Sequence, residues 1–190
     1  MESLVSESNR WQETADQLLE QSGLLSFLKH RGEVYFTGSY RYGLILSADI
    51  DLYLIHPHAG KEQALAILHA LIEQEFWNAY MYGDWVHFRS PSMPVGYYVG
   101  LKRDFAEARW KVDIWNAPEV PPQAREYNEW LACALTPETR ELILAIKKAN
   151  IRQKWDVYGV TIYDAVLTGQ VKNVEEFRLQ FVEQPQTLVN

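Results

Sequence analysis

A glycine–serine pair and a spaced pair of aspartates constrain most strongly what this chain can fold into. Apolar and aromatic residues lead into Gly38 and Ser39, and Asp49 and Asp51 open a second apolar run that extends to Ile55. Residues two apart in a strand project from the same face, so the two carboxylates would point the same way. Carboxylates this close repel each other unless a cation lies between them, and a hard divalent ion is the usual one. The pair therefore predicts half of a metal site.

A later strand supplies a third carboxylate. Residues 109–115 read as a strand in which Lys111 and Asp113 share one face. Three carboxylates from neighbouring strands can hold two Mg²⁺ ions about 3.5–4 Å apart, a clamp that stabilises the entering and leaving oxygens of an in-line phosphoryl displacement. A turn at Gly38 and Ser39 would place backbone N–H groups and a hydroxyl near phosphates. These residues together predict phosphoryl chemistry.

The rest of the chain reads as an α/β half followed by an all-helical half. Strands are predicted at residues 33–37, 49–56, 84–89, 95–103 and 109–115, with a turn at 91–94 joining the third and fourth. Helices are predicted at residues 9–22, 24–29, 61–76, 123–135, 137–152, 158–167 and 173–182. A proline-rich segment, 117–122, marks the boundary, so we expect one domain over 1–117 and a helical region over 118–190.

Composition excludes several classes of function. The chain of 190 residues has one cysteine, Cys133, which excludes an intramolecular disulfide and a zinc site built on several thiolates. The formal charge of −7 argues against a long nucleic-acid footprint, which depends on many Lys and Arg contacts to phosphate. The sequence shows no apolar run long enough to span a membrane and no export signal, so we expect a cytoplasmic protein.

These motifs resemble the nucleotidyltransferase superfamily that includes DNA polymerase beta, poly(A) polymerases and small bacterial nucleotidyltransferases. Its signature is Gly-Ser, a gap of around ten residues, Asp-x-Asp among apolar residues, and a third acidic residue on a later strand. The chain has Gly38-Ser39, Asp49-Ile50-Asp51 and Val112-Asp113-Ile114. The resemblance covers roughly residues 30–117 and implies a mixed β-sheet flanked by helices, followed by a C-terminal helical bundle.

The resemblance also implies an activity. A Mg²⁺-dependent enzyme of this kind transfers a nucleoside monophosphate from an NTP to an acceptor hydroxyl and releases pyrophosphate. Asp49, Asp51 and Asp113 would bind two Mg²⁺ ions, for which Mn²⁺ could substitute, and Asp113 could serve as general base. The Gly38 backbone and Ser39 would hold the phosphates, and ATP is the expected donor.

One face of a predicted helix carries basic residues and is the candidate binding site for the β- and γ-phosphates of the nucleotide. Arg140, Lys147 and Lys154 are two turns apart on the helix that begins at Pro137. Basic residues of the helical half hold these phosphates in small members of the superfamily, and Lys147 is the residue we select. The alternative is a solvated face balanced by neighbouring glutamates.

Several alternatives stay open at this point. Asp49 and Asp51 could lie on a solvated strand edge or cap a helix, and Asp113 could form a structural ion pair with Lys111 or Arg109. The whole chain could be a catalytically silent NTP-binding or interaction module of the same fold. The acceptor, a small molecule, a protein or an RNA end, is not encoded in these motifs, and neither is the need for a homodimer.

Overall fold

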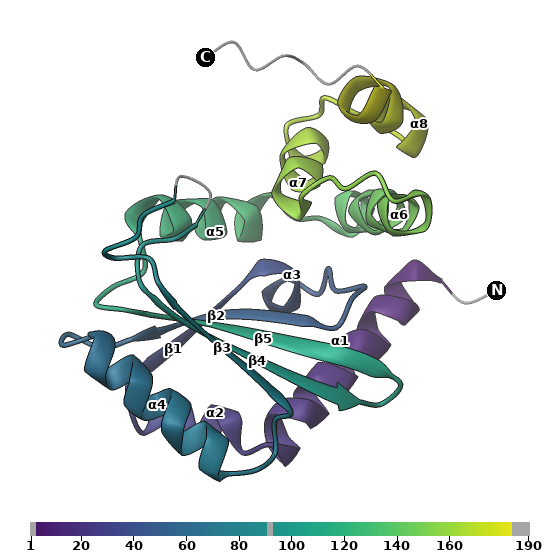
Figure 1. Ribbon diagram of the computed structural model, residues 1–190. Coiled ribbons are helices and arrows are strands. Elements are labelled where there is room, and N and C mark those ends of the chain that lie inside the picture. The colour runs from purple at the N-terminus through teal and green to yellow at the C-terminus, as the bar shows by residue number, and fades with distance from the viewer. Residues whose placement is uncertain (1–2, 91–92, 184–190) are drawn as a thin grey trace.

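The computed structural model describes residues 3–90 and 93–183, which form a five-stranded mixed sheet with helices on both sides (Figure 1). The strands are β1 (Glu33–Thr37), β2 (Asp49–Ile55), β3 (Ala79–Asp84), β4 (Tyr97–Phe105) and β5 (Ala108–Ala117). The helices of the first half are α1 (Leu4–Gln21), α2 (Leu24–Lys29), α3 (Gly38–Arg41) and α4 (Lys61–Glu73). Those of the second half are α5 (Pro122–Ala134), α6 (Pro137–Gln153), α7 (Gly159–Leu167), α8 (Val174–Phe177) and the π-helix Arg178–Glu183. The mixed sheet, the flanking helices and the helical C-terminal half predicted from the sequence are confirmed.

The strands lie in the order β1-β2-β5-β4-β3. Only β2 and β5 are parallel, while the other neighbours pair in antiparallel fashion. The chain leaves β2, forms α4, β3 and β4, and returns in β5 beside β2. Two segments about sixty residues apart in the sequence therefore become adjacent central strands.

One face of the sheet is closed by a hydrophobic core. Alternate residues of β2 and β5 point into it, among them Ile50 and Leu52 on β2 and Val112 and Ile114 on β5, all fully buried. Helices α1, α2 and α4 supply the other side of this core. Because side chains alternate across a strand, the residues between these apolar ones face the opposite side, toward the helical half.

The helical half has its own core, built mainly from α6 and α7. Leu44 and Leu46, from the loop after α3, insert into it beside Ile143 and Ile162. Helix α1 contacts both cores, since its C-terminal turns pack under the sheet and its N-terminal residues reach α6. The division of the chain near residue 117 stays a prediction.

The capping signals at the starts of α6 and α8 act as predicted, but α8 ends at Phe177 and a π-helix follows it, where one helix over 173–182 was predicted. The side chain of Thr136 accepts a hydrogen bond from the backbone N–H of Thr139 and caps α6, and Pro137 occupies the first turn. Asn173 caps α8 by accepting from the N–H of Glu176 at 2.9 Å. Helix α1 begins earlier than predicted, at Leu4, because Ser3 caps it through the N–H of Ser6.

The predicted strand at 84–89 is wrong. The strand lies earlier, as β3, and ends at Asp84, whose carboxylate accepts hydrogen bonds from the backbone N–H groups of Val86 at 3.2 Å and His87 at 3.0 Å. Such an aspartate-centred turn bends the chain out of the sheet. β3 and β4 do pair in antiparallel fashion, as expected for a hairpin. The predicted turn at 91–94 lies partly outside the described residues, which exclude 91 and 92.

Among the described residues, no helix has the length and apolar character needed to cross a bilayer.

Candidate active site

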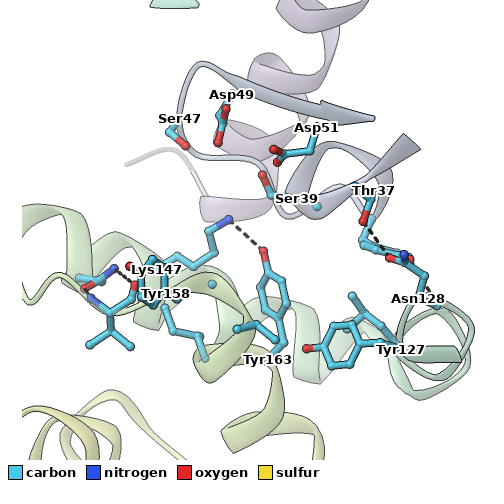
Figure 2. Close-up of a pocket in the computed structure, with 18 of the residues that line it drawn as sticks. Thr37, Ser39, Ser47, Asp49, Asp51, Tyr127, Asn128, Lys147, Tyr158 and Tyr163 are labelled. Atoms are coloured by element: carbon cyan, nitrogen blue, oxygen red, sulfur yellow. Dashed lines mark hydrogen bonds between the residues drawn. The ribbon is translucent and has the colours of Figure 1, made fainter. Parts of the chain in front are cut away.

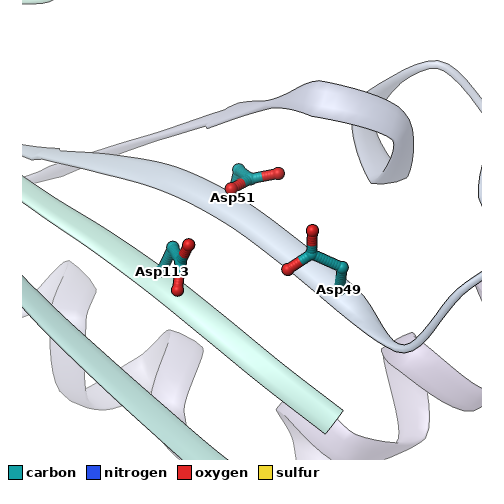
Figure 3. A group of neighbouring side chains, drawn as sticks. All are labelled: Asp49, Asp51 and Asp113. Carbon is teal, nitrogen blue, oxygen red and sulfur yellow. The ribbon is translucent and has the colours of Figure 1, made fainter. Parts of the chain in front are cut away.

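The three predicted carboxylates meet on one face of the sheet (Figure 3). The parallel register of β2 and β5 places Asp51 opposite Asp113 and Asp49 opposite Lys111. One carboxylate oxygen from each aspartate lies within 4.8 Å of the others. The strand period therefore turns the three aspartates to one side while their apolar neighbours fill the core. Asp49 and Asp51 are on a central strand, so the alternative of a solvated strand edge is wrong.

Lys111 inserts its ammonium group among these carboxylates. Its Nζ lies 2.9 Å from Oδ2 of Asp113 and 3.3 Å from Oδ1 of Asp49. The ion pair between Lys111 and Asp113, an open alternative from the sequence, is present, whereas Arg109 instead pairs with Asp104 at 3.1 Å. The ion pair places a positive charge among the three carboxylates, at a position where a metal ion would also bind.

Tyr98 is a site residue that the sequence analysis missed. Its hydroxyl donates a hydrogen bond to Oδ1 of Asp113 at 2.8 Å. Gly100 stands opposite Asp113 on β4, and a β-carbon there would overlap the Tyr98 hydroxyl. A glycine inside a strand is a recognised sign of such a close approach, and this signal was available in the sequence.

Gly38 begins α3 and lies against the carboxylate group of Asp51. Its φ is +66°, and a β-carbon at this position would lie 2.6 Å from Oδ2 of Asp51. Ser39 follows at the start of α3, with its hydroxyl turned toward the aspartates in Figure 2. The glycine therefore makes room for a carboxylate, a requirement beyond the phosphate contact predicted from the sequence.

Lys147 reaches the same site from α6 (Figure 2). Its Nζ donates hydrogen bonds to the carbonyl of Leu44 at 2.6 Å and to the hydroxyl of Tyr163 at 3.3 Å. Arg140, two turns earlier, binds the carbonyl of Gly43, and Lys154 caps the end of the helix in a left-handed conformation. Of the three basic residues predicted to share a face, only Lys147 therefore lines the pocket.

The charges of the site shift its pKa values. Burial, reinforced by the charges of Asp49 and Asp113, raises the pKa of Asp51 to about 7. Burial also raises the pKa of Asp49, although Lys111 acts in the opposite direction. Burial lowers the pKa of Lys147 to about 8, with partial compensation from Asp49 and Asp51. A carboxyl group with a pKa near neutral, beside a lysine whose pKa is lowered, marks a site short of positive charge.

A pocket of about 830 Å³ joins the two halves of the molecule at this point. The sheet side contributes Gly38, Ser39, Asp49 and Asp51, and the helical side contributes residues of α5, α6 and α7. Figure 2 shows Tyr127, Asn128, Lys147, Tyr158 and Tyr163 on the helical side, opposite the aspartates. A volume of this order accommodates a ligand of nucleotide size.

The donor set fits a hard divalent cation. Such ions take oxygen ligands from carboxylates, and the three aspartates present oxygens close enough to share one ion or two. Oδ1 of Asp49 is buried and makes no hydrogen bond among the described residues, and the ammonium of Lys111 at 3.3 Å shows that a positive charge is accommodated beside it. Asp49, Asp51 and Asp113 are therefore the residues that would hold the metal.

The sheet order, the Gly-Ser pair at the start of α3, the Asp-x-Asp pair on β2 and the third aspartate on the parallel neighbour β5 match the nucleotidyltransferase fold expected from the sequence. Comparison with solved structures agrees. The chain superposes on a structure described as the GLD-2/RNP-8 complex with a TM-score of 0.51, 14% identity, and coverage of 96% of this chain and 74% of that chain. A second structure, described as a complex of the poly(A) polymerase GLD-2 with GLD-3, gives 0.47 and 15% identity, covering 100% and 67%. No family model and no curated protein sequence matches the chain.

Proposed function

We propose that this protein is a nucleotidyltransferase that moves a nucleoside monophosphate from an NTP to an acceptor hydroxyl. The observation that carries the proposal is the meeting of Asp49, Asp51 and Asp113 on the wall of a nucleotide-sized pocket. In the reaction, the acceptor oxygen bonds to the α-phosphorus as the bond to the bridging oxygen of the β-phosphate breaks. The hydroxyl proton is lost and pyrophosphate leaves.

Each residue of the site would have a role in this reaction that follows from its position. Asp49 and Asp51 would bind the divalent ions, and Asp113, on the neighbouring strand, would complete the site on the acceptor side and could accept the hydroxyl proton. Bound Mg²⁺ supplies charge neutralisation of the phosphates and polarises the reacting oxygens. The Gly38 backbone and Ser39 would hold the phosphates from the sheet side. Lys147 would meet the β- and γ-phosphates from the helical side, where its ammonium already lies at the pocket wall.

The fold comparison supports the proposal at the level of the fold. The structure described as the GLD-2/RNP-8 complex shares its fold with 96% of this chain. At this low identity the likeness concerns the fold, so the acceptor of the present protein is left open between a small molecule, a protein and an RNA end. ATP is the donor we expect.

The test is a transfer assay with each of the four α-labelled NTPs, Mg²⁺ or Mn²⁺, and candidate acceptors drawn from metabolites, proteins and short RNAs. We expect labelled acceptor and an equal amount of pyrophosphate, both abolished by Asp49→Asn with Asp51→Asn and reduced at least a hundredfold by Asp113→Asn. Asp104→Asn, at the far end of β4, is the matched control and should retain activity. Transfer that survives the double substitution, or NTP binding without transfer to any acceptor, would overturn the proposal in favour of a silent binding module.

A further inference from the structure

The ammonium group of Lys111 lies between two carboxylates of the triad, where a metal ion would also bind. Its ammonium contacts one oxygen of Asp49 and one of Asp113, on the β5 side of the triad. No ion pair joins it to Asp51 within the part of the chain that the structure describes. The triad is therefore divided into a side that holds an ammonium and a side, toward Asp51 and the pocket, that does not.

We propose that Lys111 is an internal cation that competes with a divalent ion for the Asp49–Asp113 side, so that the two metal positions load unequally. The proposal rests on the proposed function only for the identity of the site as a metal site. The first ion would bind between Asp49 and Asp51, where no ammonium stands in the way. The second ion, which needs Asp113, would bind only when the ammonium of Lys111 moves aside.

Charge balance supports this order. When all three carboxylates are ionised, they and the ammonium of Lys111 together carry two net negative charges, which a single divalent ion neutralises. A second ion makes the cluster positive unless the ammonium leaves or an anionic nucleotide arrives. Close like charges in a partly buried site repel strongly, so the second position should stay weak in the absence of nucleotide.

The backbone and the surroundings of Lys111 permit this movement. Lys111 is held in place by pairing with β2 on one side and β4 on the other, so its backbone is fixed. Its side chain is 38% exposed, which leaves a route for the ammonium to swing into solvent without disturbing the core. Lys111 is thus a positioning residue that acts on the metal site through charge.

The protein offers a matched control. Lys102 lies directly opposite Lys111 on β4, on the same face of the sheet, and forms no ion pair among the described residues. Lys111→Met and Lys102→Met remove the same charge from neighbouring positions, but only the first removes an ammonium that contacts the carboxylates. Lys111→Arg retains a cation at the position.

The experiment is Mn²⁺ binding at pH 8 without nucleotide, followed by the electron paramagnetic resonance signal of free Mn²⁺. We expect one tighter and one weaker ion in the wild-type protein, with dissociation constants at least tenfold apart. Lys111→Met should strengthen the weaker position at least tenfold, whereas Lys102→Met and Lys111→Arg should stay within threefold of wild type. A Lys111→Met isotherm that matches wild type would overturn the proposal.

A second measurement uses the unaltered chain and does not depend on how the variants fold. Acetylation of lysines, followed by mass spectrometry, should be slow at Lys111 without metal and at least fivefold faster at saturating Mn²⁺, with Lys102 unchanged. An unchanged rate at Lys111 would contradict displacement. Neither readout involves transfer, so a protein that fails the transfer assay but shows these effects loses the proposed function and retains this inference.

Discussion

Gly38 lies directly against Asp51, so that a β-carbon on the glycine would stand 2.6 Å from the carboxylate oxygen Oδ2. The carboxylate of Asp51 therefore occupies the space that a side chain at position 38 would need, so the second aspartate of the Asp-x-Asp pair requires the glycine of the Gly-Ser pair. They are thirteen residues apart, and they are brought together because β1 and β2 pair with Thr37 opposite Asp51.

Gly38→Ala should therefore damage the metal site specifically. We expect Mn²⁺ affinity to fall at least tenfold, because the new methyl group displaces the carboxylate of Asp51. Gly23→Ala is the matched control, since Gly23 has a similar φ of +63° but nothing within 4 Å of the added carbon. Both substitutions should cost about 1–2 kcal/mol of stability from the left-handed backbone, and only the first should impair metal binding. Equal Mn²⁺ affinity in the two variants would contradict this steric account.

The raised pKa of Asp51 predicts an unusual dependence of stability on pH. Its folded value of about 7 exceeds the ordinary 3.8, so between these values the folded protein holds a proton that the unfolded chain does not. The free energy of unfolding of the metal-free protein should therefore fall as the pH rises from about 4 to about 7, by at most about 4 kcal/mol at about 1.36 kcal/mol per pKa unit.

Urea unfolding in EDTA across this pH range measures the effect. Asp51→Asn should flatten the dependence, while Asp104→Asn should leave it as in wild type. Added Mn²⁺ should raise the unfolding midpoint more at pH 8 than at pH 6, because the ion requires the ionised carboxylate. A urea midpoint of unfolding in EDTA that rises steadily from pH 4 to pH 7 would argue against a proton held by Asp51 in the folded protein.

Lys147 should contribute to nucleotide binding through its charge. With a pKa of about 8, the side chain of Lys147 is mostly charged at pH 7 and loses its proton as the pH rises through 8. We expect ATP affinity, measured by calorimetry with Mg²⁺, to fall at least tenfold in Lys147→Met, and to fall in wild type between pH 7 and pH 9. Lys148→Met, which removes only an ion pair with Glu7, is the control and should bind ATP as wild type does.

Asn128 should be important for stability because it connects the two halves of the fold. It is 3% exposed, and its side-chain oxygen accepts hydrogen bonds from the Tyr42 hydroxyl at 2.6 Å and the Thr37 hydroxyl at 3.2 Å. Its amide group donates to the carbonyl of Ala124 at 2.8 Å. Asn128→Ala removes the side-chain acceptor of Thr37 and one of the two acceptors of Tyr42, whose hydroxyl keeps the Asn128 carbonyl at 3.0 Å, and this should cost about 2–3 kcal/mol in urea unfolding. Asn78→Ala, which removes an exposed hydrogen bond to Asp104, should cost less than about 1 kcal/mol.

The sequence alone determined the strands that carry Asp49, Asp51 and Asp113, because period-two alternation with apolar neighbours is a local property that needs no partner. It also determined where α6 and α8 begin, because their capping side chains bond within their own first turn. The strand predicted at 84–89 failed since alternation alone cannot show that a carboxylate, here that of Asp84, will bind the backbone ahead of it.

Only the tertiary structure decided which residues share the pocket. The parallel pairing of β2 with β5 set Lys111 beside Asp49 and Asp113, and the packing of α6 on the loop after α3 turned Lys147, but not Arg140 or Lys154, toward the site. These contacts join residues up to about a hundred positions apart, so strand register and helix packing, rather than any local pattern, fix them. The Gly-Ser and Asp-x-Asp pairs thus predict phosphoryl chemistry from local sequence, whereas the fold decides which lysines lie beside the carboxylates.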